Sequence, residues 1–300
     1  MPPKPRPRLL AATLTLATAA ALAHPGSGIV IDARGQVYLT DTGQGVWRFG
    51  ADKTPRLISS QAFHWMAIDE KGHFAGSTAL GEHDGGTFSR ITPPGAVPAL
   101  ILSSDYPVTI GSDGALYYVP MSQTGPRELI RRTPDGKRSV FATLPDAAGA
   151  KPARWVNGIA AGPDGALYVT DNDTIRKIDK AGTVSTVLHH AKLNDCANPL
   201  PGAPGLPYFR GLAVAPDGAI YAAANGCRTV VSVSLKGAVR TVLVAQPPWS
   251  PTGVALVGSE VYVLEYTHTS GDDRREWVPR IRSVTSHGEV RTLVTIRRPK

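Results

Sequence analysis

The stretch that decides the fold of this chain, residues 155–188, reads WVNGIAAGPDGALYVTDNDTIRKIDKAGTVSTVL. It contains four short apolar runs, which are Gly158–Ala161, Ala166–Thr170, Thr174–Ile178 and Val184–Leu188. Asp164-Gly165 separates the first two runs and Ala181-Gly182 the last two, and such glycines supply the positive φ of tight hairpin loops. The pattern predicts four antiparallel strands of about five residues each. A sheet of this size cannot bury both faces alone, so it needs neighbours of its own kind.

The neighbours are present as further copies of the same unit. The turn residue between the first two strands recurs at Gly35, Gly72, Gly114, Gly165 and Gly218 and near Ser259. An aromatic residue follows each turn, at Tyr38, Phe74, Tyr117, Tyr168, Tyr221 and Tyr262. A β-sandwich gives no reason for this chemistry to repeat, whereas four-stranded units repeated every 40–50 or so residues are typical of a β-propeller. We therefore predict an all-β fold, a six-bladed β-propeller of four-stranded antiparallel blades, closed by packing blade six on blade one.

Two of the copies carry a family resemblance. The units that begin at Asn157 (NGIA…PDG…LYVTD) and Arg210 (RGLAVAPDG…IY) resemble NHL repeats and the related gluconolactonase and regucalcin propellers. The resemblance covers nearly the whole chain after the N-terminal segment, but its motifs specify blades rather than a reaction. The resemblance implies a metal-dependent lactonase, in which carboxylate and asparagine side chains hold the metal at the mouths of the inner strands. Asn157 matches that asparagine, while Ser27 and Arg210 stand where Glu and Asp are expected.

The N-terminal segment, residues 1–23, has the pattern of a secretory signal peptide. Three basic residues precede the apolar run Leu9–Leu22, and Ala21-Leu22-Ala23 forms a cleavage site. A membrane anchor is the alternative, but the run is short for spanning a bilayer. We expect cleavage before His24, a single propeller domain over residues 24–300, no membrane span afterwards and a periplasmic or secreted location.

Charge and loop length indicate where ligands bind. Basic residues are scattered, so we expect no nucleic-acid partner. We also expect a monomer. One face of the propeller would carry the long loops Ser77–Gly86, Met121–Arg127 and Tyr266–Trp277 and the connection that begins at His189. These loops hold His83, Asp84, His189, His190, His268, Asp272, Asp273 and Glu276. Aligning the repeats also predicts a ligand-binding ring at the channel mouth on this face, made of Ser27, His64, Tyr106, Asn157, Arg210 and Thr252.

Three readings of function stay open, and with them the question of catalysis. The first is non-catalytic binding of a small molecule, peptide or glycan at the long-loop face. The alternative is a metal-dependent lactonase or esterase at the channel mouth, with calcium as cofactor and Asn157 and His64 as candidate ligands. A protein-contact scaffold is a third reading. Arg210 needs an acceptor, which is either Asp171 or Glu265 within the fold or an anionic ligand.

Two other side-chain groups have predicted structural roles. Asp41 and Asp171 end second strands, where we expect their carboxylates to accept backbone N–H groups of the following turn. Cys196 and Cys227, the two cysteines of the chain, fall on loops of the same face beside the same blade. Export supplies an oxidising compartment, so we predict a disulfide between them.

Overall fold

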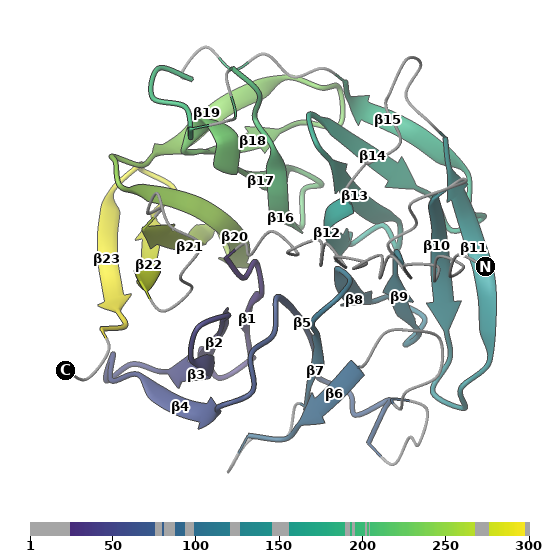
Figure 1. The fold of residues 1–300 in the computed structure, drawn as a ribbon. Helices are drawn as coiled ribbons and strands as arrows, with labels where there is room; N and C mark the ends of the chain where they lie inside the picture. Colours follow the sequence, from purple (N-terminus) through teal and green to yellow (C-terminus); the bar gives the residue numbers. More distant parts are fainter. Residues whose placement is uncertain are drawn as a thin grey trace, which may run out of the picture.

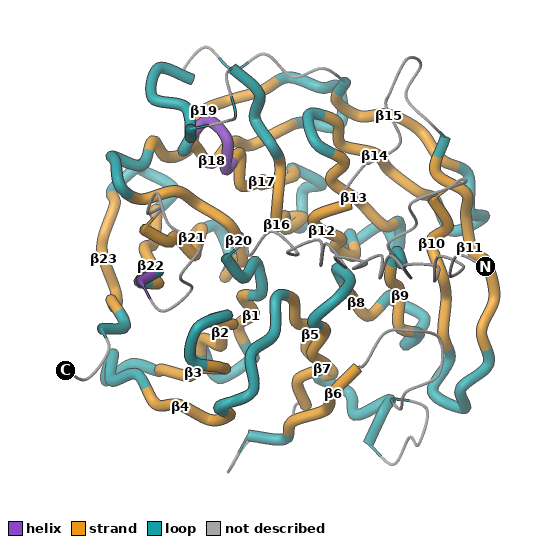
Figure 2. Tube along the Cα trace, in the orientation of Figure 1, coloured by secondary structure: helices purple, strands orange, loops and turns teal. Residues whose placement is uncertain are grey.

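The fold is that of a computed structural model, which describes residues 25–75, 80, 88–93, 99–120, 127–145, 156–189, 193, 196–201, 203, 205–267 and 276–297. Six antiparallel sheets stand as blades around a central channel (Figure 1). Nearly all of the described chain is strand or loop. A short 3-10 turn, η1 (Asn225–Cys227), interrupts blade five, and Figure 2 shows a second short helical piece beside β22. The predicted signal peptide lies outside the described residues, as do His83, Asp84, His190, His268, Asp272 and Asp273.

Five of the blades have four strands each in the order of the sequence. Blade one comprises β1 (Ile29–Ile31), β2 (Val37–Asp41), β3 (Gly45–Phe49) and β4 (Arg56–Ser59). Blade three comprises β8 (Val108–Ile110), β9 (Leu116–Tyr118), β10 (Arg127–Arg132) and β11 (Arg138–Leu144). Blade four comprises β12 (Val156–Ala161), β13 (Leu167–Asp171), β14 (Thr174–Ile178) and β15 (Val184–Leu188). Blade five comprises β16 (Phe209–Val214), β17 (Ile220–Ala224), β18 (Thr229–Val233) and β19 (Val239–Val244). Blade six comprises β20 (Trp249–Val257), β21 (Glu260–Thr267), β22 (Pro279–Val284) and β23 (Val290–Thr295).

Blade two departs from the expected strand order. Within its described residues it has three strands, β5 (Trp65–Asp69), β6 (Phe88–Ile91) and β7 (Ala99–Ser103), and β7 pairs directly with the inner strand β5. The sequence ALILS of β7 is buried throughout, which suits a strand covered on both faces. Strand β6 carries the exposed Arg90 and lies at the sheet edge. We had expected β7 at the outer edge of the blade. Its burial accounts for its place beside the inner strand β5.

The turn chemistry agrees with the sequence. Glycines 35, 72, 114, 165 and 218 all have positive φ, between 68° and 86°, and Gly258 takes this conformation in blade six. The neighbouring acidic residue of the turn accepts a hydrogen bond from the repeated tyrosine in three blades, in the pairs Asp32–Tyr38, Asp113–Tyr117 and Asp164–Tyr168. The repeated aromatic therefore anchors its own hairpin turn as well as filling the core.

Each blade packs its apolar side chains against the next. One cluster joins blade one to blade six through residues such as Leu39 and Leu264, and Tyr266 of blade six donates its hydroxyl to the Thr40 carbonyl of blade one. The closure predicted from the repeats, without an exchanged strand, holds throughout the described sheets. Threonines of two second strands reach the following blade, because Thr40 Oγ1 lies 3.3 Å from the His64 carbonyl and Thr170 Oγ1 lies 2.7 Å from that of Arg210.

The predicted disulfide is present. Cys196, on the connection between blades four and five, bonds to Cys227 of η1 with a Cα–Cα distance of 4.6 Å. This bond is consistent with an extracellular or periplasmic location. Among the helical segments of the described chain, none is long and apolar enough to cross a membrane.

Candidate channel-mouth site

Glycines bring the inner strands into close contact at the channel mouth. A Cβ on Gly158 would lie 2.4 Å from the Arg210 carbonyl of blade five, and one on Gly253 would lie 2.4 Å from the Ser27 carbonyl of blade one. Gly211 similarly approaches Gly253, and Gly28 approaches the Met66 amide of blade two. Since these neighbours are main-chain atoms, a side chain cannot be accommodated without moving a strand. The repeated glycine thus fixes the spacing of blades four, five, six and one.

Blades two and three break this glycine rule. The equivalent positions hold Trp65 in blade two and Pro107 in blade three. Trp65 does not remain within its own blade: its indole Nε1 donates to the main-chain carbonyl of Asn157 in blade four, at 2.8 Å. The side chain, which is 7% exposed, therefore spans the part of the mouth beside blade three.

The inner strands of all six blades line a channel of about 310 Å³, and Trp65 contributes to its wall. Of the six predicted ring residues, Ser27 lines this cavity. The others point elsewhere: His64 Nδ1 lies 2.8 Å from the Ser104 carbonyl, Tyr106 packs between Phe88 and Tyr118, and Thr252 is fully buried. The reason is geometric, because an inner strand meets the channel with its edge and its side chains alternate toward the two neighbouring blades.

Arg210 is a buried cation of the predicted ring, 7% exposed. Its Nη2 donates to the main-chain carbonyl of Pro25 at 2.7 Å, which ties the start of the propeller to blade five. Burial lowers the pKa of the guanidinium from its usual range to about 10, although the field of Tyr266 acts to raise it. Burial also raises the pKa of Tyr266 well above its usual value, and the charge of Asp41 adds to this shift. Arg210 remains charged at neutral pH.

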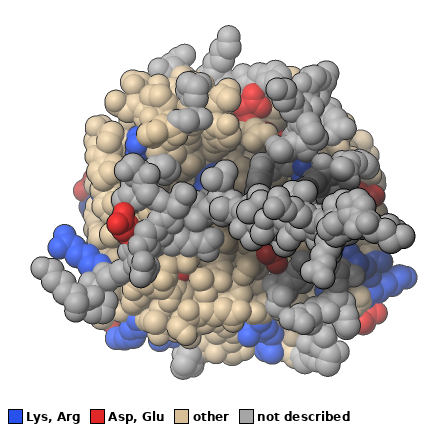
Figure 3. Space-filling model, viewed as in Figure 1, with Lys and Arg blue, Asp and Glu red and all other residues tan. Residues whose placement is uncertain are grey.

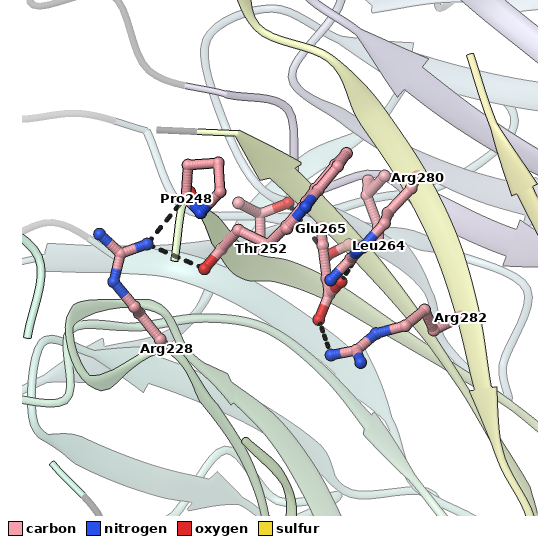
Figure 4. Close-up of polar contacts among 8 residues, drawn as sticks. Arg228, Pro248, Thr252, Leu264, Glu265, Arg280 and Arg282 are labelled. Atoms are coloured by element: carbon pink, nitrogen blue, oxygen red, sulfur yellow. Dashed lines mark hydrogen bonds and ion pairs between the residues drawn. The ribbon is translucent and has the colours of Figure 1, made fainter. Parts of the chain in front are cut away.

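The two carboxylates considered as acceptors for Arg210 face other arginines. Glu265 is fully buried and receives bonds from Arg280 and Arg282, both at 2.5 Å, as Figure 4 shows. The same figure shows Arg228 of blade five bonded to the carbonyl of Pro248 at the start of blade six. Asp171 faces Arg176 of its own blade at 3.7 Å. A main-chain carbonyl, that of Pro25, is an acceptor for Arg210 that the sequence did not indicate.

The strand-end aspartates differ from one another. Asp41 caps its turn as expected, accepting the Gly43 amide at 2.9 Å and the side chain of Gln44 at 3.2 Å. Asp171 is 4% exposed and lies beside the equally buried Arg176. The first carboxylate stabilises a loop, and the second balances a charge within the blade.

The donor set of the mouth does not fit calcium. Calcium needs several carboxylate or carbonyl oxygens around one point. The ring offers no carboxylate, His64 is engaged with Ser104, and the positive charge of Arg210 would oppose a cation. Within the described residues there is also no group of three or more His, Cys, Asp or Glu side chains that could hold a metal ion.

Part of the surrounding surface can be seen in Figure 3. On this face the described residues are mostly uncharged, and the visible Lys and Arg side chains lie mainly toward the rim. His189 is exposed, as is Glu276, and these two are the predicted loop residues that the structure describes.

The chain resembles several solved structures. A catalytically inactive virginiamycin B lyase from Staphylococcus aureus with quinupristin is 17% identical, over 91% of this chain and 85% of that one, with a TM-score of 0.53. A luciferin-regenerating enzyme is 15% identical over 87% and 91%, with a TM-score of 0.57. Regucalcin, a calcium-binding protein from Agrobacterium tumefaciens, is 16% identical over 80% and 81%, with a TM-score of 0.50.

This chain folds as a six-bladed propeller, and its fold is similar to those of virginiamycin B lyase and regucalcin. The resemblance stated from the repeats is thereby confirmed for the fold. Identities this low carry no activity from one protein to another. No protein-family model matches the sequence, and no curated protein matches it.

Sequence reasoning missed Trp65. The signal was available, since Trp65 and Pro107 occupy the positions that are glycine in the other four copies. The ring that we predicted consists of the residues one position earlier in each copy. Side-chain alternation along the strand turns those residues away from the channel.

Proposed function

We propose that this protein is exported and binds a small molecule, peptide or glycan over the channel mouth, on the side of blades two to four, without catalysing a reaction. The observation that carries the proposal is the reach of Trp65 across the mouth to the Asn157 carbonyl, 92 positions along the chain. The indole is 7% exposed and packs in the core of blades two and three, and its hydrogen bond preorganises the part that lines the channel. The long loops expected on this face would then supply specificity.

The polar residues of the ring support binding rather than catalysis. Arg210, His64 and Thr252 are each bonded to a main-chain carbonyl, at 2.7, 2.8 and 3.5 Å. A general base needs to be within hydrogen-bond reach of a substrate proton. These contacts hold the mouth in shape instead of presenting a nucleophile and a base to each other.

A fluorescence screen tests the proposal. Purified mature protein is titrated with panels of peptides, oligosaccharides and small polar molecules, and tryptophan emission is recorded. A ligand at the mouth should change the emission of the wild type and of Trp47→Phe, and lose that change in Trp65→Phe. Trp47 lies in blade one and serves as the matched control.

An activity panel tests the same proposal from the other side. Lactones and aryl esters are supplied with calcium, and calcium binding is measured by calorimetry. We expect no turnover. Calcium-dependent hydrolysis together with tight calcium binding would overturn the non-catalytic assignment and favour the metal-dependent lactonase.

A further inference from the structure

A second cavity lies away from the channel, between the hairpin turns of blades three and four. Its volume is about 250 Å³, and its wall includes Ser112, Tyr117, Arg131, Phe141, Leu167 and Lys180. Pockets for drug-sized ligands are usually larger, about 300–1,000 Å³. This cavity therefore has room for a ligand with one ring rather than several.

Part of the wall is a repeated structural feature. Asp113 accepts the Tyr117 hydroxyl at 2.9 Å and Arg131 Nε at 2.8 Å. Blade four repeats the arrangement, with Asp164 bonded to Tyr168 and paired with Lys177. Because it recurs, this triad stabilises blades and does not by itself indicate a ligand.

Two residues distinguish this cavity from the equivalent places in other blades. Each four-stranded blade has a bulge in its pairing with the outer strand, and the residue skipped there is Ile58, Phe141, Val187, Val242 or Leu293. Blade three thus has an aromatic residue where the others are aliphatic. The Phe141 ring meets that of Tyr117 edge to face, with centroids 5.2 Å apart.

The second distinguishing residue is Lys180. Its Cε lies 2.3 Å from the position that a Cβ on Gly165 would take, and Ser112 Oγ of blade three lies 3.0 Å from the same point. In blade five the corresponding residue over the turn glycine Gly218 is Leu235. A cation and a hydroxyl from two blades therefore meet at the rim of this cavity, where the next blade has an apolar side chain.

The charges of the cavity leave it able to bind an anion. The charge of Asp113 is balanced by Arg131, whose Nε donates a hydrogen bond to the carboxylate. The Arg131 side chain is about one-third exposed. Within the described part of the chain, Lys180 makes no hydrogen bond or ion pair. The lining side chains therefore sum to one positive charge, and an ammonium and the end of a guanidinium are left to face solvent.

We propose that this inter-blade cavity binds a small aromatic carboxylate, with the ring against Phe141 and Leu167 and the carboxylate between Lys180 and Arg131. The aromatic wall suits a ring edge or face, and the two cations suit a carboxylate, in charge-assisted hydrogen bonds. The site is independent of the channel mouth, so it stands or falls separately from the function proposed above.

The probe is 4-fluorobenzoate, titrated with the full chain and followed by ¹⁹F NMR. The matched variants copy other blades: Lys180→Leu copies Leu235, and Phe141→Val copies Val187. Lys236→Leu removes an exposed lysine of the blade-five turn as the charge control. Each variant is checked by thermal unfolding, and since Lys180 is exposed, its variant is expected to fold.

We expect saturable binding that weakens roughly tenfold in Lys180→Leu, because a hydrogen bond to a charged group is lost. Phe141→Val should also weaken binding, Lys236→Leu should not, and neutral 4-fluorobenzamide should bind much less tightly than the carboxylate. Unchanged binding in Lys180→Leu would overturn the proposal. So would equal weakening in Lys236→Leu, which indicates diffuse attraction, or equally effective competition by inorganic phosphate, which indicates that the ring contributes nothing.

Discussion

The indole of Trp65 in blade two is hydrogen-bonded to the carbonyl of Asn157 in blade four, so one side chain bridges two blades that are not neighbours around the ring. The contact is possible because blade two has tryptophan where four blades have glycine. The bond joins blade two, which lacks the close-contact glycine, to blade four, which has it at Gly158. The mouth is therefore stabilised by main-chain packing on one side and by a side chain on the other.

This bridge gives a first prediction. Trp65→Phe keeps an aromatic ring but removes the N–H donor, and should lower the free energy of unfolding by about 1 kcal/mol beyond the effect of lost area. Trp47→Phe is the control, because the Trp47 indole N–H is buried without a hydrogen-bond partner in the described structure. Urea unfolding of both variants checks this. Equal losses would mean that the Asn157 bond contributes nothing.

A second prediction concerns the glycine contacts. Gly253→Ala would place a Cβ 2.4 Å from the Ser27 carbonyl, an atom that cannot rotate away. We expect destabilisation of about 3 kcal/mol, at the upper end for overpacking. Gly288→Ala, in an open turn with φ of 83°, should cost about 1 kcal/mol from backbone strain alone. Thermal or urea unfolding that ranked the two in the opposite order would contradict the close-contact explanation.

A third prediction separates the charge of Arg210 from its packing. Arg210→Ala removes the bond to Pro25 and leaves a cavity, so we expect a loss of about 2–4 kcal/mol. Arg210→Met fills most of the volume and avoids burying a cation. The cost of that burial is what lowers the pKa of the native guanidinium to about 10. The methionine variant should therefore cost less than half as much. If the methionine variant is as unstable as the alanine variant, the charge itself is required.

A fourth prediction concerns alkaline pH. Burial, followed by the hydrogen bond to Asp113, raises the pKa of Tyr117 to about 12, and burial with the Asp32 charge raises that of Tyr38 to about 12. Because the pKa of each tyrosine is higher in the folded than in the unfolded protein, it contributes to the free energy of unfolding. This contribution is full below about pH 10, the pKa in the unfolded chain, and is lost as the pH rises toward 12. Tyr117→Phe should flatten this part of the stability profile, measured by urea unfolding from pH 8 to 11.5. An unchanged slope would contradict the assignment.

The disulfide gives a fifth prediction. Replacing Cys196 and Cys227 together by alanine opens a bridge with a sequence separation of 31 and should lower stability by roughly 3–4 kcal/mol in the chain-entropy model. Thiol titration of the unfolded, unreduced wild type should detect no free thiol. Finding two would refute the bond, and a reductant should bring wild type and variant to the same stability.

Much of the fold could be predicted because it depends on local chemistry that repeats. Positive φ at Gly165 follows from its turn, and strands β14 and β15 begin and end at the residues expected from their apolar runs. The strand order of blade two could not be predicted in this way. The buried strand β7 pairs with β5 rather than lying at the edge, and pairing across a sheet depends on burial that no single segment reveals.

The sequence by itself determined the blades, their number and the turns, because each follows from periodicity or from the conformational demands of a few neighbouring residues. It also indicated the cysteine pair, because the repeats place both cysteines on loops of one face. Only the tertiary structure decided where the side chains of the mouth point. An inner strand presents its edge to the channel, so Tyr106 turns into the interface of blades two and three and Thr252 bonds within blade six. Arg210 bonds to the carbonyl of Pro25, and Trp65 reaches across to Asn157. Those partners lie far apart along the chain, and closure of the ring brings them together.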